Sequence, residues 1–228
     1  MKVVVVIPAY RAEQTVAAVI RDVRAQGLPV IVVDDGSSDG TADAAEHAGA
    51  AVIRRRVNGG KGAALREGLA SACRQGYDWI VTMDADGQHL ASEVPAFLRE
   101  AEGGQADLVL GNRMNRPRGM PLDRRVTNWF MSALLSRATG EELPDTQCGF
   151  RAVSRRLLES VRLCGDRFEI ESELVLRAAR AGFRIQSVPV TSVYRRQISF
   201  IRPIRDTVRF ARLLLTQGGS NRNARAGL

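Results

Sequence analysis

Residues 30–41 read VIVVDDGSSDGT and decide the fold, because an apolar run passes here into a polar loop and then into a helical pattern. The run at 30–33 contains only β-branched residues, which indicates a strand covered on both faces, as in a parallel sheet. The loop is built from Asp, Ser and Gly, and Ser38 or Asp39 is suited to cap a helix over 39–47. A strand that leads through a polar loop into a helix is the repeating unit of α/β proteins.

The same unit recurs on both sides of this stretch. Further apolar runs predict strands at 3–7, 51–53, 79–83 and 108–110, and helical patterns lie between them at 13–26 and 61–74. Strands that alternate with helices predict an α/β fold with a doubly wound, mostly parallel sheet and flanking helices. Such sheets bind ligands beyond the carboxyl ends of their strands, so functional residues are expected directly after strands.

The second half of the chain is less regular. Its pattern predicts helices at 126–138, 171–181 and 201–215, with a short strand at 185–188. We find no internal repeat and no linker composition that would divide the chain. We therefore expect a single domain over 1–216, with a regular half at 1–112 and an irregular half at 113–216. A disordered tail is expected at 217–228, which is rich in Gly, Asn and Arg.

Composition points to anionic partners. The chain has 228 residues and a net charge of +8, and only Lys2 and Lys61 are lysines, so arginine supplies nearly all of the positive charge. Arginine binds phosphate in a planar, bidentate way, which favours nucleotides or phospholipids as partners. No nucleic-acid-binding motif is present, so nucleic acid is not an expected partner. The three cysteines have no CxxC spacing, which predicts a reducing, cytoplasmic setting without disulfides.

A carboxylate cluster follows the strand at 79–83, in the segment MDADGQH at 83–89. Asp84 and Asp86 lie two residues apart, so both carboxylates can converge on one cation. Hard divalent ions prefer such oxygen ligands, and Mg²⁺ is commonly held by one or two carboxylates together with substrate phosphates. Gln88 can add a neutral oxygen ligand and His89 can support the site. The alternative interpretation is a solvated acidic turn.

Two other strand ends predict a nucleotide pocket. Pro8 and Tyr10 follow the first strand and can form a wall against a base, while Asp34 or Asp35 can accept hydrogen bonds from a base or ribose. Helix capping is the simpler explanation for this aspartate-rich loop, and both roles are compatible.

The segment NGGKG at 58–62 opens the helix at 61–74. Glycines let a backbone approach closely, and a helix N-terminus favours anions, so this segment and Lys61 can face phosphate. A plain turn explains it equally well, because the spacing is not that of a phosphate-binding P-loop.

The helix predicted at 201–215 is amphipathic. Apolar residues recur at helical spacing and arginines form a neighbouring stripe, which is typical of a helix that lies on an anionic membrane. A helix that packs on its own domain gives the same pattern. The apolar helix at 126–138 can be core, a partner interface or a second membrane contact. No apolar run reaches the roughly 20 residues needed to cross a bilayer, so we expect peripheral contact with the cytoplasmic face, with or without a membrane-protein partner.

Taken together, these segments resemble the family 2 glycosyltransferases, and most closely the polyprenyl-phosphate branch that includes dolichol-phosphate mannose synthases. The quoted residues are, in order, IPAY (7–10), VVDDGSSDGT (32–41), NGGKG (58–62), MDADGQH (83–89), GNR (111–113) and DTQCGFRA (145–152). Weaker similarity continues through FEIESEL (168–174) and VYRR (193–196). One departure is that no glycine follows Tyr194, where the synthase branch commonly has a small-residue run; Ser199 is present.

The resemblance implies a GT-A type fold, a bound Mg²⁺ or Mn²⁺ and an inverting sugar transfer. It implies a donor-binding half at 1–112 and an acceptor-side half at 113–216. It places Asp84, Asp86 and Gln88 at the metal. Around the nucleotide it places Pro8, Tyr10, Glu13, Asp34 and Asp35, and we add Lys61 and Asp84 to the donor side. Toward the acceptor phosphate it places Arg113, Arg124 or Arg125, and Arg195.

The expected reaction transfers a hexose from a nucleoside diphosphate sugar, GDP-mannose or UDP-glucose, to a polyprenyl phosphate at a membrane. Asp86, Arg113 and Glu171 are the expected catalytic residues. A phosphate acceptor is already anionic and needs cations, whereas a hydroxyl acceptor, as in cell-wall or exopolysaccharide synthesis, needs a general base. Glu171 is the candidate base by resemblance, and simple pairing with an arginine is the alternative.

The segment after residue 144 is expected on the sugar side of the site. Asp145 can bind a sugar hydroxyl, or the segment can be a tight turn at Gly149 with Phe150 in the core. Cys148 is expected to be a packed small residue and not a nucleophile, because no partner that would stabilise a thiolate is evident. A nucleotide-binding adaptor without catalysis is a further alternative, against which the intact Asp84 and Asp86 pair argues.

Overall fold

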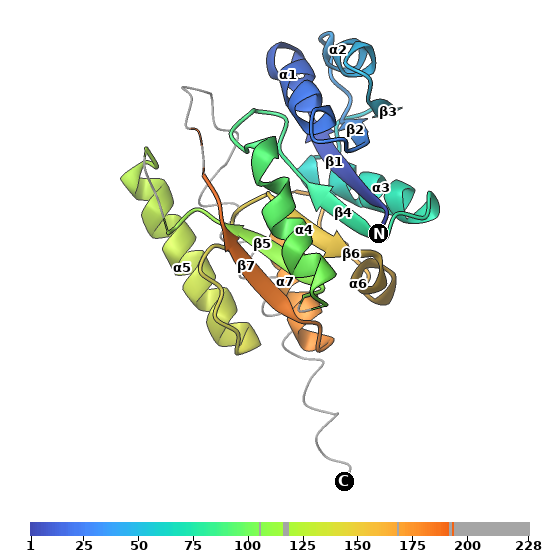
Figure 1. Cartoon of the computed structure of the whole chain (residues 1–228). Helices are drawn as coiled ribbons and strands as arrows, with labels where there is room; N and C mark the ends of the chain where they lie inside the picture. The colour runs from blue at the N-terminus through green and yellow to red at the C-terminus, as the bar shows by residue number, and fades with distance from the viewer. Residues whose placement is uncertain (105, 116–118, 168, 192, 194–228) are drawn as a thin grey trace. The chain divides into compact units, whose positions relative to one another are not determined.

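The computed structural model describes residues 1–104, 106–115, 119–167, 169–191 and 193, which belong to one compact unit within Met1–Arg195. Its sheet contains seven strands in the order β3-β2-β1-β4-β6-β5-β7. These strands span β1 (Val3–Ala9), β2 (Val30–Asp34), β3 (Ala51–Arg54), β4 (Trp79–Thr82), β5 (Leu108–Asn112), β6 (Arg151–Ser154) and β7 (Ile185–Pro189). The predicted mostly parallel α/β sheet is therefore confirmed (Figure 1).

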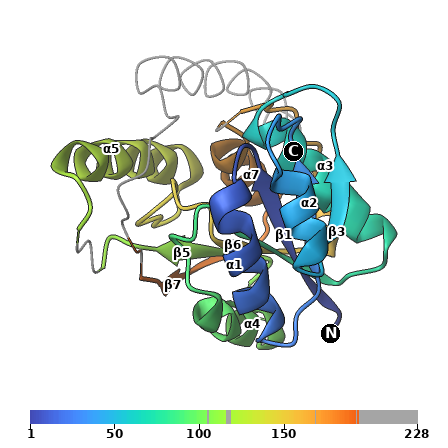
Figure 2. The same cartoon turned by 90° about the horizontal axis from the view of Figure 1, so that it is seen from above.

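Helices connect the strands and cover both faces of the sheet. They span α1 (Glu13–Arg24), α2 (Thr41–His47), α3 (Lys61–Arg74), α4 (Val94–Glu102), α5 (Leu122–Thr139), α6 (Arg155–Ser160) and α7 (Glu169–Arg180), and a 3-10 turn, η1 (Ala91–Glu93), precedes α4. Seen from above, α1 and α4 lie on one side of the sheet, with α3 and α7 on the other (Figure 2).

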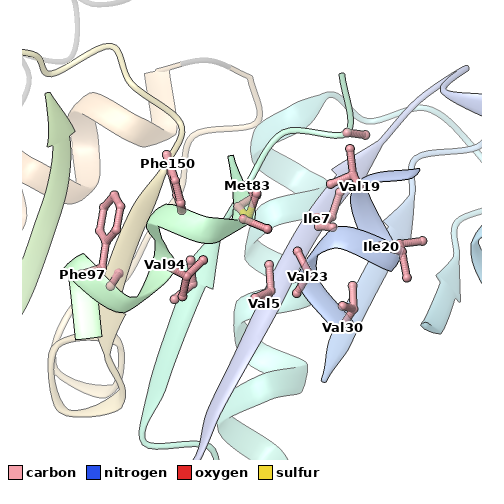
Figure 3. Close-up of a cluster of buried hydrophobic side chains, with 14 of the residues drawn as sticks. Val5, Ile7, Val19, Ile20, Val23, Val30, Met83, Val94, Phe97 and Phe150 are labelled. Carbon is pink, nitrogen blue, oxygen red and sulfur yellow. The ribbon is translucent and has the colours of Figure 1, made fainter. Parts of the chain in front are cut away.

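The first strand, β1, is apolar throughout because it is covered on both faces of the sheet. Val5 and Ile7 pack with α1 and α4 in one buried cluster, where Phe97 meets Phe150 (Figure 3). Val4 and Val6 point to the opposite face and pack against α3. Because side chains alternate along a strand, a strand covered on both faces needs apolar residues at every position. The edge strand β3 is only partly buried.

The largest departure from the sequence prediction is β6. Four residues, RAVS, form a strand that pairs antiparallel with β4 on one side and with β5 on the other. The sequence pattern predicts no strand here, and it predicts neither α4 nor α6. Since β6 is antiparallel to both neighbours, β4 and β5 run in the same direction.

This topology brings the motif-bearing segments to one edge of the sheet. β1, β2, β4, β5 and β7 all end at that edge, because each pair among them runs parallel directly or through β6. The antiparallel β6 begins there, so the segment 145–150 that precedes it reaches the same edge. The predicted helix 201–215, the tail 217–228, Arg195 and Ser199 lie outside the described residues.

Candidate active site

Lys61 lies between two carboxylates at this edge. Its Nζ atom lies 2.6 Å from Oδ1 of Asp84 and 2.8 Å from Oε1 of Glu171. Lys61 opens α3, Asp84 follows β4 and Glu171 belongs to α7, so three distant segments meet here. Burial lowers the pKa of Lys61, but the two carboxylates raise it more, so the net pKa lies above its ordinary value and the ammonium stays charged.

Asp84 is held as a carboxylate by these neighbours. Burial raises the pKa of Asp84, while Lys61, His89 and Arg113 lower it, and the result is about 2. The backbone N–H of Asp84 donates to Nδ1 of His89 over 3.3 Å, and the His89 ring stacks on Phe150 with centroids 5.1 Å apart. The expectation that His89 supports this loop therefore agrees with its contacts.

Asp86 differs from Asp84 in its electrostatics. Burial and then the negative charge of Asp84 raise the pKa of Asp86. Its Oδ1 accepts from the backbone N–H of Gln88 over 2.9 Å, which closes the turn. A divalent cation near both aspartates would relieve their repulsion. Within the described part of the chain, no three His, Cys, Asp or Glu side chains form a complete metal cage. Two carboxylates fit an ion that takes its remaining ligands from substrate phosphates.

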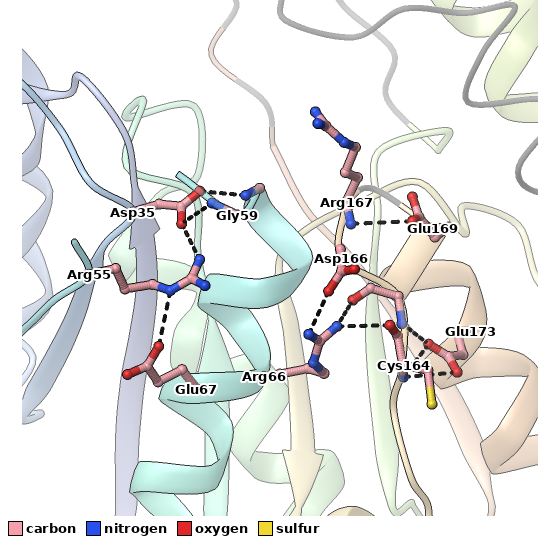
Figure 4. Close-up of polar contacts among 12 residues, drawn as sticks. Asp35, Arg55, Gly59, Arg66, Glu67, Cys164, Asp166, Arg167, Glu169 and Glu173 are labelled. Atoms are coloured by element: carbon pink, nitrogen blue, oxygen red, sulfur yellow. Dashed lines mark hydrogen bonds and ion pairs between the residues drawn. The ribbon is translucent and has the colours of Figure 1, made fainter. Parts of the chain in front are cut away.

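Asp35 has a structural role that the sequence analysis did not predict. Its carboxylate is buried, accepts from the backbone N–H groups of Gly59 at 3.0 Å and Gly60 at 2.7 Å, and pairs with Arg55 (Figure 4). The anion at the start of α3 is therefore a side chain of the protein itself. Asp35 therefore fixes the start of α3, and its contact with the nucleotide stays a prediction.

The glycines of the 58–62 segment allow a close approach, but to protein backbone. A Cβ on Gly62 would lie 2.6 Å from the carbonyl oxygens of Gly165 and Arg167, and one on Gly60 would lie 2.6 Å from that of Asp166. The N–H of Ala63 donates to the Asp166 carbonyl over 3.0 Å. The segment 164–167 thus lies against the start of α3. No local signal predicts this, because the two segments are about 100 residues apart in the chain, as the contact of Arg66 with Gly165 illustrates.

The remaining donor-side candidates surround the ends of β1 and β2. Pro8 is paired with Val33 inside β1, and so lies in the strand and not after it as expected. Tyr10 follows β1, with the guanidinium of Arg11 over its ring at 5.3 Å. Arg11 has a φ of 51°, the one positive value among the described non-glycine residues. Strained backbone of this kind is typical of functional sites.

Asp34 and Glu13 complete the donor side. Asp34 is buried at the end of β2, and its Oδ1 accepts from the N–H of Ser37 at 3.3 Å. Glu13 opens α1, and its carboxylate lies against Gly40, where a Cβ would come within 2.6 Å of Oε1. The expectation that Ser38 or Asp39 caps the helix is wrong, because α2 begins at Thr41 and its N-cap residue is Gly40, without a side-chain cap. Asp39 lies one residue earlier, and its Oδ1 accepts from the N–H of Thr41 at 3.2 Å.

Arg113 and Asp145 form a two-pronged ion pair. Nε of Arg113 donates to Oδ2 of Asp145 at 2.8 Å, and Nη2 donates to Oδ1 at 3.0 Å. The Asp145 side chain is fully buried and also accepts from the N–H groups of Arg113 and Gln147. The oxygens of Asp145 therefore hold Arg113 in place, and contact of Asp145 with a sugar hydroxyl stays a prediction. The charge of Arg113 still reaches the site, since it lowers the pKa of Asp84.

Arg151 is a functional candidate that the sequence analysis missed. Its side chain is almost fully buried and donates to the carbonyls of Thr146 at 2.8 Å, Cys148 at 2.8 Å and Glu171 at 2.5 Å. One guanidinium thus fixes both the 145–150 segment and the start of α7. Cys148 is buried as expected, and burial raises its pKa to about 12, which rules it out as a thiolate nucleophile at neutral pH.

Helix α5 carries an exposed apolar face. Leu122 is 76% exposed, Val126 and Trp129 are each 64% exposed, and Phe130 is 49% exposed. These positions follow helical spacing, so they lie on one side of the helix. The candidates Arg124 and Arg125 belong to the same helix, and Arg125 is exposed. No described helix is long and apolar enough to span a bilayer.

The sequence is similar to a known family and to several curated relatives. The sequence model described as Glycosyl transferase family 2 matches residues 4–162. The chain is 33% identical to the undecaprenyl-phosphate mannosyltransferase of Micrococcus luteus, over 86% of this chain and 85% of the relative. It is 32% identical to the polyprenol monophosphomannose synthase of Mycolicibacterium smegmatis, over 83% of this chain and 77% of the relative.

Among solved structures, the chain is similar to glucosyl-3-phosphoglycerate synthase from Mycobacterium tuberculosis in complex with Mn²⁺, UDP and phosphoglyceric acid. The TM-score is 0.74 and the identity 27%, over 96% of this chain and 78% of that structure. The expected GT-A fold is therefore confirmed.

Proposed function

This chain belongs to glycosyl transferase family 2, in its polyprenyl-phosphate branch, and on that premise we propose that it transfers a hexose from a nucleoside diphosphate sugar to a polyprenyl phosphate. The observation that carries the proposal is that two carboxylates, Asp84 and Asp86, lie close to two cations, Lys61 and Arg113, at one edge of the sheet. Carboxylates for a metal and cations for phosphates are what a diphosphate donor and a phosphate acceptor require.

We assign Asp84, Asp86 and Gln88 to hold a Mg²⁺ or Mn²⁺ ion, which would supply positive charge next to the donor diphosphate. Tyr10, Asp34 and Glu13, at the ends of β1 and β2, would contact the nucleotide. Attack from the face opposite the diphosphate gives an inverting transfer. Catalysis in this scheme is mainly positioning and charge stabilisation.

A phosphate acceptor suits the charges better than a hydroxyl acceptor. Glu171, the candidate base, is already paired with the Lys61 ammonium at 2.8 Å, so a cation already engages its carboxylate. An acceptor phosphate is anionic at neutral pH and needs no base. It needs a cation, and Arg113, which Asp145 holds in place, would supply it.

The direct test offers purified protein GDP-mannose, UDP-glucose and related nucleotide sugars, with and without a short polyprenyl phosphate, in Mg²⁺ or Mn²⁺. We expect glycolipid formation with at least one donor, and its loss when the metal is chelated. Glu171→Gln separates the acceptor classes, because with a phosphate acceptor it should not abolish transfer. No glycolipid with any donor, or transfer to a sugar hydroxyl that Glu171→Gln abolishes, would contradict the proposal.

We further propose that the apolar face of α5 contacts an anionic membrane, where the acceptor lipid resides. Leu122, Val126, Trp129 and Phe130 would enter the lipid interface, and the exposed Arg125 would face anionic headgroups.

The prediction for this face is that Trp129→Ser weakens binding to phosphatidylglycerol-containing vesicles at least about tenfold, because a buried large apolar side chain contributes about 1.5–3 kcal/mol. Vesicle co-sedimentation measures the change. Ala138→Ser, an exposed position on the opposite side of α5, is the matched control and should bind as the wild type does. Equal binding of both variants would exclude this face as the membrane contact.

A further inference from the structure

The position of Lys61 raises the question of how a metal ion reaches Asp84. Lys61 Nζ lies 2.6 Å from Oδ1 of Asp84, a separation at which the ammonium takes the place that a cation would occupy on that oxygen. The side chain of Lys61 is 18% exposed and that of Asp84 is 29% exposed, so this pair is only partly screened by water. An incoming ion must therefore compete with a positive charge already bound to its ligand.

Glu171 gives Lys61 a second anchor. Its carboxylate is 8% exposed and lies 2.8 Å from Nζ, so Lys61 stays charged and in place even when its contact with Asp84 is weakened. Gly149 closes the cluster on one side, since a Cβ there would lie 2.8 Å from Oδ2 of Asp84 and 3.0 Å from Nζ. Lys61 can therefore exchange one anionic partner for another without leaving the site.

We propose that Lys61 occupies Asp84 until the metal arrives together with the donor diphosphate, and then passes from Asp84 to the diphosphate. The inference rests on the proposed function, because it requires a metal and a diphosphate at this edge. A metal ion that binds alone has to displace Lys61 from Asp84, and the positive charge of the displaced lysine then stays next to the ion. A metal bound to a diphosphate brings the anion that receives the lysine. Lys61 in this role binds the donor diphosphate directly and makes binding of the two ligands cooperative.

The test is the affinity for Mn²⁺ alone, measured by electron paramagnetic resonance in the absence of nucleotide, in the wild type and in Lys61→Met. We expect Lys61→Met to bind Mn²⁺ alone on the order of 10-fold more tightly, a size typical of coupling between sites. The same variant should bind UDP or GDP more weakly in saturating Mn²⁺. Opposite changes in the two affinities are the signature of an exchanged lysine.

Three further variants secure the interpretation. Lys61→Arg keeps the charge and should retain the weak binding of Mn²⁺ alone. Arg66→Met removes a positive charge one turn further along α3, where the guanidinium pairs with Asp166, and should leave Mn²⁺ affinity unchanged. Lys61→Gln retains a hydrogen-bond donor for Glu171 and should repeat the Lys61→Met result; it replaces Lys61→Met if circular dichroism shows that variant to be unfolded.

The outcomes separate the inference from the proposed function. If the wild type binds neither UDP nor GDP in Mn²⁺, the proposed function fails. If it binds one of them, but the neutral variants at position 61 bind Mn²⁺ alone no more tightly than the wild type, the proposed function stands and the exchange is wrong. A loss of nucleotide affinity without a gain in metal affinity would make Lys61 a plain donor ligand.

Discussion

Asp86→Ala should lower kcat/KM for sugar transfer by at least about 1,000-fold, which corresponds to about 4 kcal/mol of transition-state stabilisation. Asp84 and Asp86 both lie in the loop that follows β4, and the negative charge of Asp84 raises the pKa of Asp86. Such mutual repulsion is a cost in the metal-free protein that a divalent ion relieves. Without Asp86 the ion keeps one carboxylate, which Lys61 also contacts, so the departing diphosphate loses its main source of neutralising charge.

Asp86→Asn is the matched variant for this prediction. It keeps an oxygen to accept from the Gln88 N–H, and so preserves the turn while it removes the charge. Both variants should melt near the wild-type temperature and both should lose transfer. Asp43→Ala, which removes a surface carboxylate paired with Arg54, should remain active. A fully active Asp86→Ala enzyme would remove the basis for metal-assisted transfer.

The sequence predicts the parallel part of the fold because the signals are local. Each of β1, β2 and β4 is a short apolar run followed by a polar loop, and α3 begins and ends where its pattern predicts. β6 gives no such signal. Its four residues include an arginine, RAVS, and its strand character depends on pairing with β4 and β5. Tertiary pairing of this kind overrides local propensity.

The same distinction between local signals and tertiary contacts applies to the residues of the site. That Asp84 and Asp86 follow a buried strand can be predicted from the sequence alone. That Asp145 holds Arg113, 32 residues away, and that Asp35 holds Gly60, 25 residues away, depends on how the chain folds back. Aspartates in polar loops look alike in sequence, and only their partners distinguish a ligand-binding carboxylate from one that fixes the backbone.

Arg151→Met should lower the free energy of unfolding by about 3–5 kcal/mol, because the loss of hydrogen bonds to three buried carbonyls outweighs the desolvation free energy that removal of the guanidinium recovers. Arg151 is 2% exposed and donates to three backbone carbonyls, those of Thr146, Cys148 and Glu171. Methionine fills much of the volume but donates to none of them. Each buried acceptor left without a donor costs about 1–3 kcal/mol. Urea unfolding followed by circular dichroism measures the difference.

Two effects oppose each other in Arg151→Met, and their balance decides whether the free energy of unfolding falls or rises. Burial disfavours the guanidinium and lowers the pKa of Arg151, so its removal recovers some desolvation free energy. The carbonyls remain buried, however, and the β6 pairing prevents the segment from moving out to water.

The stability of Arg151→Lys should therefore fall between those of the wild type and Arg151→Met, because a compact ammonium cannot reach three separated carbonyls as the planar guanidinium does. Arg162→Met, at an exposed position, should change stability by less than about 0.5 kcal/mol. If Arg151→Met were as stable as the wild type, the 145–150 segment and the start of α7 would be held by other contacts, and Arg151 would not be what positions Asp145 and Glu171.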